Sequence, residues 1–135
     1  MLLDPLASAH AAALWAGLHV ILLLVLSVLV TRQRRKHQVE IGDGGVPALT
    51  QAIRAFGNAT EYVPTALAGL ALLALVGALP LLIHAVGLTL FVGRVLHGFG
   101  LSRSIAATWP RAVGVLATWI AYVAMAASLL FYAFP

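Results

Sequence analysis

The segment LASAHAAALWAGLHVILLLVLSVLVTRQRRK, residues 6–36, begins with a long apolar run and ends in a basic cluster. A helix needs roughly 20 apolar residues to cross the hydrocarbon core of a bilayer, and the run from Leu6 to Val30 is long enough. The positive charge follows this run, which is the opposite order from a cleavable signal peptide. The segment therefore predicts a retained transmembrane helix whose basic end lies at the cytoplasmic surface.

The composition of the whole chain also indicates a membrane protein. Of its 135 residues, 62% are hydrophobic and 9% are charged, and the mean hydropathy is +1.02. Soluble domains are about a quarter charged, so this class is nearly excluded. The absence of cysteine excludes disulfides, thiolate metal ligands and a cysteine nucleophile. The net charge of +4 is concentrated beside apolar runs, so we expect no nucleic-acid partner.

Three further apolar segments follow the first, and turn-forming residues separate them. We predict an all-α fold, an integral membrane four-helix bundle, as one domain over residues 1–135. The expected helices cover about 6–31, 48–77, 81–99 and 110–134. All eight lysines and arginines lie in or beside the first and third connections. The positive-inside rule then places both termini outside and both basic loops in the cytoplasm.

The helix expected over residues 48–77 carries a polar stripe in its first half. Arg54, Asn58 and Glu61 recur at helical spacing and fall within a stripe of about 60° on one face. Tyr62 lies beside this stripe. Ionisable groups at membrane depth are costly and usually face a bundle interior or a wet cavity. The stripe therefore predicts either a structural polar cluster between helices or an open site that faces the cytoplasm.

The helix expected over residues 81–99 carries Arg94 and His97 on one face, at a similar depth. We expect the two polar faces to converge. Glu61 would then meet Arg94, a charge on a ligand, or a neighbouring chain. Because cations outnumber acids here, the site favours an anionic, peptide-like ligand. The histidines are scattered along the chain, so no metal site is expected.

Two segments resemble a known membrane family. The segment RAFGNATEYVP, residues 54–64, is similar to the second-helix signature of the membrane-associated proteins in eicosanoid and glutathione metabolism, the MAPEG family. The segment GRVLHGFGL, residues 93–101, resembles that family's third helix. The resemblance covers essentially the whole chain, which looks like a short bacterial member of the microsomal glutathione transferase type. It implies a homotrimer with glutathione bound between adjacent subunits near the cytoplasmic side.

The resemblance also implies roles for individual residues. A catalytic arginine near the start of the fourth helix stabilises the glutathione thiolate in active members; Arg111 is the nearest equivalent, and Arg103 is the second candidate. Several eicosanoid-forming members carry a tyrosine where this chain has Leu101, which argues against those activities. The residues that would contact glutathione are Arg54, Asn58, Glu61, Tyr62, Arg94 and His97.

The expected function is a glutathione-dependent transferase or peroxidase that acts on lipophilic electrophiles. The expected partners are glutathione, a lipophilic substrate and membrane lipids, and the expected location is the bacterial inner membrane. The alternative is a non-catalytic membrane protein that binds a lipid or a small anion in the same intersubunit pocket. A transporter subunit is disfavoured, because the polar groups gather at one end instead of crossing the bilayer.

Overall fold

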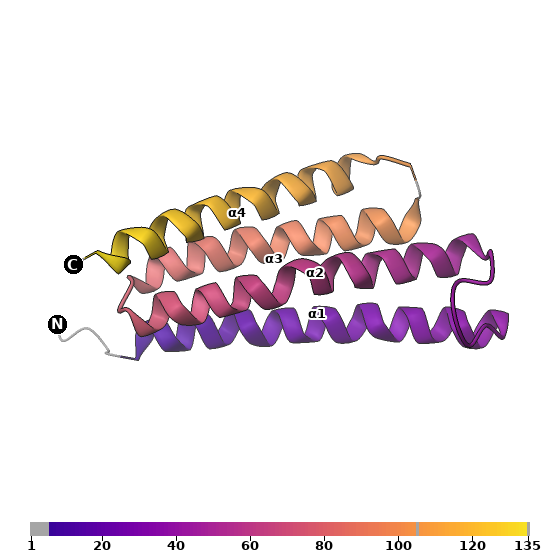
Figure 1. Cartoon of the computed structure of the whole chain (residues 1–135), viewed down its shortest axis with the longest axis horizontal. Helices are drawn as coiled ribbons and strands as arrows, with labels where there is room; N and C mark the ends of the chain where they lie inside the picture. The colour runs from indigo at the N-terminus through magenta and orange to yellow at the C-terminus, as the bar shows by residue number, and fades with distance from the viewer. Residues whose placement is uncertain (1–5, 105, 135) are drawn as a thin grey trace.

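A computed structural model of the chain describes residues 6–104 and 106–134. Within these residues the chain forms four helices and no strand. The helices run up and down as one bundle, with the first and third connections at one end (Figure 1). The prediction of an all-α four-helix bundle is confirmed. The helices are α1 (Ala7–His37), α2 (Pro47–Leu75), α3 (Pro80–Arg103) and α4 (Trp109–Ala133).

The helix α1 is longer than predicted, because the basic cluster is itself helical. Its last turn contains Arg34, Arg35, Lys36 and His37, where positive charge favours the negative end of the helix dipole. The helix ends at Gln38, which adopts a left-handed backbone conformation with φ of 55°. Arg34 forms hydrogen bonds between the end of α1 and the connection that follows it. Its Nη1 donates to the carbonyls of Val39, Glu40 and Gly42 at 3.4, 3.1 and 2.9 Å.

The other three helices begin within one residue of their predicted starts. Each has a proline in its first two positions, where the missing N–H is not needed: Pro47, Pro80 and Pro110. The helix α2 ends at Leu75, two residues earlier than predicted, because Gly77 turns the chain with a φ of 74°. The helix α3 continues beyond residue 99 to Arg103, which brings its end beside the start of α4.

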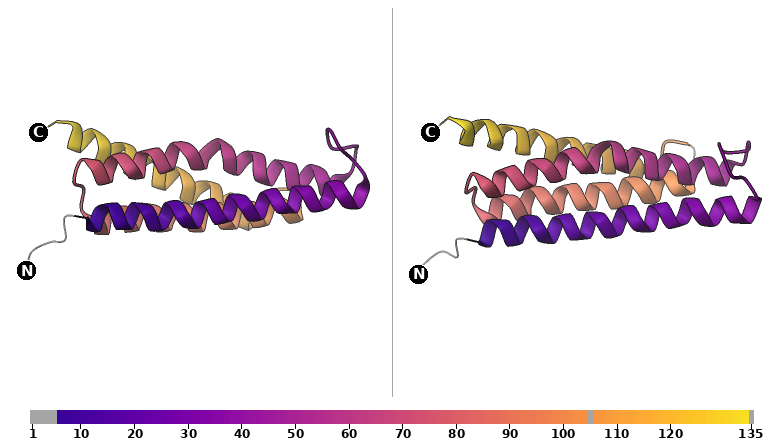
Figure 2. Two further views of the ribbon diagram at one scale, coloured as in Figure 1. Left: turned by 90° about the horizontal axis from the view of Figure 1, so that it is seen from below. Right: turned by 60° about the horizontal axis from the view of Figure 1, so that its bottom comes forward.

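Among the described helices, α1, α3 and α4 are each long and apolar enough to cross a membrane. The helix α2 falls short of that hydropathy because its first half carries the polar stripe. It nevertheless packs lengthwise against α1 and α3, as both views in Figure 2 show. The bilayer must therefore hold α2 as part of the bundle, with Asn58 and Tyr62 partly buried among the other helices and Glu61 on the exposed face.

Two glycines bring α3 and α4 into close contact toward the end of the bundle that carries the third connection. A Cβ atom on Gly114 would lie 2.5 Å from the backbone nitrogen of His97 and 2.6 Å from the carbonyl oxygen of Gly93. A Cβ on Gly93 would in turn meet the carbonyl of Gly114 at 2.9 Å. The absence of both side chains therefore sets the distance between α3 and α4, as small residues do in membrane helix pairs.

Candidate functional site

A polar cleft of about 400 Å³ opens toward the end of the bundle where the first and third connections lie. Its walls come from the first half of α2, the second half of α3 and the start of α4. A smaller hollow of about 140 Å³ adjoins it and shares Arg54, Leu101 and Arg111. The cleft is lined by Arg54, Asn58, His97, Leu101, Ala107, Thr108, Arg111, Ala112 and Val115.

The cleft is positively charged. Among the described residues that line it, Arg54 and Arg111 are the charged groups, and there is no carboxylate. Arg111 lies in the first turn of α4, where the helix dipole is positive and backbone N–H groups lack helical acceptors. These features favour an anion. The structure brings Arg54, Asn58 and His97 together, as the shared faces predicted, and Arg111 lines the same cleft from α4.

Arg94 lies behind this cleft and is 1% exposed. Its Nε donates to Thr118 Oγ1 at 2.9 Å, and its Nη1 donates to Asn58 Oδ1 at 2.8 Å. Arg94 does not line the cleft. It lies in the buried layer of side chains behind Asn58, which does line it. It holds Asn58 in place by its oxygen, which leaves the amide Nδ2 as the Asn58 donor that can face a ligand.

The ring of Tyr62 packs against the guanidinium of Arg94. The guanidinium carbon of Arg94 lies 4.9 Å from the centroid of the Tyr62 ring, a cation–π geometry. The Tyr122 ring meets Tyr62 edge-on with centroids 5.8 Å apart, and its hydroxyl donates to the Tyr62 carbonyl at 2.6 Å. Tyr62 therefore lies in the layer beneath the cleft, beside Arg94, and does not line the cleft in the described part of the chain.

Glu61 lies outside the cleft, on the exposed face of α2. The expectation that it meets Arg94 within the chain is wrong, because the Arg94 hydrogen bonds go to Asn58 and Thr118. Three residues along a helix correspond to a rotation of about 60° away from Asn58, which turns Glu61 outward. No described residue forms an ion pair or hydrogen bond with its carboxylate. The two other expectations, a ligand or a neighbouring chain, stay predictions.

The two candidate catalytic arginines occupy different places. Arg111 lines the cleft, whereas Arg103 projects over Phe99, with its guanidinium carbon 4.3 Å from the ring centroid. The geometry thus favours Arg111 of the two. Thr118 was missed by the sequence analysis. It lies seven residues after Arg111, on the same face of an otherwise apolar helix, and this spacing is the signal that points to it.

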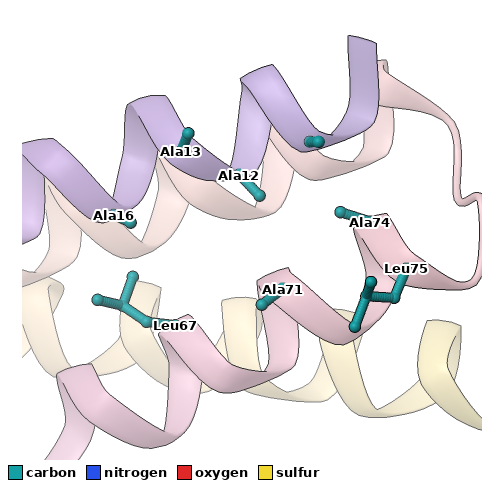
Figure 3. Close-up of a pocket in the computed structure, with 8 residues that line it drawn as sticks. Ala12, Ala13, Ala16, Leu67, Ala71, Ala74 and Leu75 are labelled. Carbon is teal, nitrogen blue, oxygen red and sulfur yellow. The ribbon is translucent and has the colours of Figure 1, made fainter. Parts of the chain in front are cut away.

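A second hollow of about 380 Å³ lies at the opposite end of the bundle, between the start of α1 and the end of α2 (Figure 3). Alanines of α1 face Leu67, Ala71 and Leu75 of α2 across it. Its described lining is entirely alanine and leucine. The described side chains that line this hollow include no polar or ionisable group. The hollow is separate from the polar cleft.

Residues 12–131 match the MAPEG family, and this match includes almost all of the four helices. The chain belongs to the MAPEG family. It is 37% identical over 121 residues to the inner membrane protein YecN of Escherichia coli strain K12, covering 90% of this chain and 91% of that protein. YecN of Escherichia coli O6:H1 matches equally well. The prediction that this MAPEG protein is an integral inner-membrane protein is thereby confirmed.

Proposed function

We propose that this MAPEG protein is a glutathione-dependent transferase or peroxidase that acts on lipophilic electrophiles in the membrane. The observation that carries the proposal is the cleft in which Arg54 of α2 and Arg111 of α4 face one space with Asn58 and His97. Glutathione is a small peptide with two carboxylates and two amides. Guanidinium groups match carboxylates well, and the Asn58 amide suits a peptide carbonyl.

The proposed chemistry needs the thiol of glutathione as a thiolate. A free thiol has a pKa near 8.5 and is mostly protonated at neutral pH, but a nearby cation lowers that pKa. In the proposal Arg111 lies beside the sulfur and stabilises the thiolate. The thiolate then forms a carbon–sulfur bond with an electrophile that enters from the bilayer. It could equally attack the O–O bond of a lipid hydroperoxide, with a second glutathione completing the reduction.

We also propose that the cleft lies at a boundary between copies of this chain in a homotrimer. Glu61 supports this placement, because its exposed carboxylate in the middle of α2 has no partner among the described residues. An unpaired carboxylate facing lipid is costly. A neighbouring subunit or the glutathione ammonium would satisfy it. Native mass spectrometry in detergent should find three copies of the 14.2 kDa chain, and a monomer under the same conditions would contradict the trimer.

The test of function is calorimetric titration with glutathione, with thiolate absorbance recorded in the same samples. Arg54→Ala and Arg111→Ala should each weaken binding or thiolate formation about tenfold, the effect of losing a charge-assisted hydrogen bond. Arg103→Ala is the matched control, since Arg103 is basic, lies at the same end and does not line the cleft. It should change neither quantity by more than about twofold.

Three outcomes are informative. Binding with thiolate at neutral pH, lost in Arg111→Ala, supports the transferase or peroxidase. Binding without thiolate would retain the pocket and overturn the role given to Arg111. No binding at millimolar glutathione would overturn the proposal in favour of a protein that binds a lipid or small anion, which mass spectrometry of co-purified ligands would then identify.

A further inference from the structure

We infer that His97 is the base that takes the proton from the glutathione thiol, an inference that rests on the proposed function. His97 lines the cleft together with Arg54 and Arg111, and it is 6% exposed. Its Nδ1 lies 3.2 Å from the carbonyl oxygen of Arg111, across the contact between α3 and α4. A histidine held in this way has one ring nitrogen engaged and one available.

The hydrogen bond to Arg111 decides which nitrogen is available. A carbonyl oxygen accepts, so Nδ1 carries the hydrogen in this bond and Nε2 carries the lone pair of a neutral imidazole. The other described polar groups that line the cleft are guanidinium, amide and hydroxyl groups. None of these is a base at neutral pH. Nε2 of His97 is therefore the basic atom that this wall offers to a thiol proton.

The charges around His97 make it a transient acceptor. Arg54 of α2 and Arg111 of α4 line the same cleft, and Arg94 lies one turn earlier on α3, while α1 contributes no residue to the described cleft lining. The charges of Arg94 and Arg111 disfavour a lasting imidazolium, and the cations that line the cleft favour a thiolate. The S–H bond breaks, its electron pair stays on sulfur, and an N–H bond forms at Nε2. The proton then passes to water in the open cleft, which returns the imidazole to its neutral form.

This assignment separates the roles of two residues. Arg111 determines how much thiolate is present at equilibrium, because its charge stabilises the anion. His97 determines how quickly the thiolate forms, because it provides the route for the proton. Close packing of Gly114 on the backbone of His97 holds the imidazole within reach of the Arg111 carbonyl.

Rapid mixing of the purified protein with glutathione, followed by thiolate absorbance, tests the inference. His97→Gln should slow thiolate formation by about a hundredfold, the usual contribution of a general base. Its final thiolate amplitude at saturating glutathione should stay within about twofold of the wild type, because Arg111 sets that equilibrium. The wild-type rate should rise with pH through one ionisation that His97→Gln lacks. His37→Gln, at the exposed end of α1, is the matched control and should leave the rate unchanged.

His97→Ala adds a readout that a structural role would not produce. It opens space beside Arg111, and imidazole in the buffer should restore part of the lost rate. An unchanged rate in His97→Gln, or a loss that imidazole does not restore and that accompanies weaker binding, would overturn the inference. Failure of the wild type to bind glutathione would overturn the proposed function itself. Normal thiolate formation with no effect at His97 would overturn this inference alone.

Discussion

Arg94 serves the cleft without lining it. From the sequence, its shared face with His97 predicted that it converges with the polar stripe of α2, and the family resemblance implied a contact with glutathione. In the structure its Nε and Nη1 donate to Thr118 and Asn58, its guanidinium lies over the Tyr62 ring, and its buried Nη2 has no hydrogen-bond partner among the described residues. A buried cation that joins three helices orients the Asn58 amide, so its effect on a ligand passes through Asn58.

Thr118→Val tests this layer, because it removes the acceptor for Arg94 Nε while nearly keeping the side-chain shape. A buried donor left without an acceptor costs about 1–3 kcal/mol, so the free energy of unfolding in detergent should fall by that amount. Thr89→Val is the control, since its hydroxyl donates to Ala85 in its own helix. An equal fall in the free energy of unfolding in the two variants would show that the Thr118–Arg94 hydrogen bond adds no stability.

Asp43 gives a prediction about pH in the connection between α1 and α2. Hydrogen bonds from the Gly45 backbone N–H and the Thr50 hydroxyl, both at 3.0 Å, lower the pKa of this carboxyl below its ordinary 3.8. A lowered pKa means that the stabilisation is complete above the ordinary value and is lost as pH falls through the folded-state value. Protection of the Gly45 amide from hydrogen exchange should therefore decrease below pH 3.8. Asp43→Asn keeps an amide oxygen that accepts from Gly45 and does not titrate, so its protection should not change with pH in this range. Wild-type protection that stays constant as the pH falls would contradict this account.

At the scale of elements, the contact between α3 and α4 should be the most sensitive to added volume. Gly114→Ala places a Cβ against backbone atoms of His97 and Gly93, so the helices must separate. Overpacking of this kind costs about 1–3 kcal/mol, measurable as a loss in the free energy of unfolding. Gly17→Ala is the control, because nothing lies within 4 Å of its added Cβ. It should be neutral or stabilising, since alanine favours a helix by about 1 kcal/mol over glycine.

The same variant connects packing to the proposed chemistry. If α4 moves away from α3, the bond from His97 Nδ1 to the Arg111 carbonyl lengthens. Gly114→Ala should then also slow thiolate formation. A variant that loses stability and keeps its full rate would separate the two effects.

For the whole molecule, the prediction concerns orientation. The first and third connections lie at one end of the bundle, and the basic residues are concentrated in the helices beside them, so we expect that end in the cytoplasm (Figure 1). The chain has no cysteine, so single cysteines report accessibility cleanly. In spheroplasts, a membrane-impermeant maleimide should label Leu79→Cys, in the second connection. The same reagent should label Glu40→Cys, in the first connection, only after the spheroplasts are lysed. The reverse pattern would place the basic end outside.

Much of the architecture could be read from the chain. The apolar runs, the three prolines at helix starts and the order of charge predicted four helices within a few residues. The ends of α1 and α3 were placed too early, because basic residues that leave the hydrocarbon region remain helical when a packed neighbour and the helix dipole favour them. The cleft residues Arg54, Asn58, His97 and Arg111 were identified, whereas Glu61, Tyr62 and Arg94 proved to lie around the cleft.

Hydropathy and the order of charges along the chain were enough to determine a membrane protein with four helices and a basic end. Hydropathy and charge act between each segment and the bilayer, so their effects do not depend on which helices are neighbours. The tertiary structure alone decided which polar side chains share a space. That choice depends on the rotation of each helix and on how closely Gly93 and Gly114 let α3 approach α4. It made Arg94 a buried support, left Glu61 on the outer face and brought His97 against Arg111, because packing between distant segments sets where each helix face points.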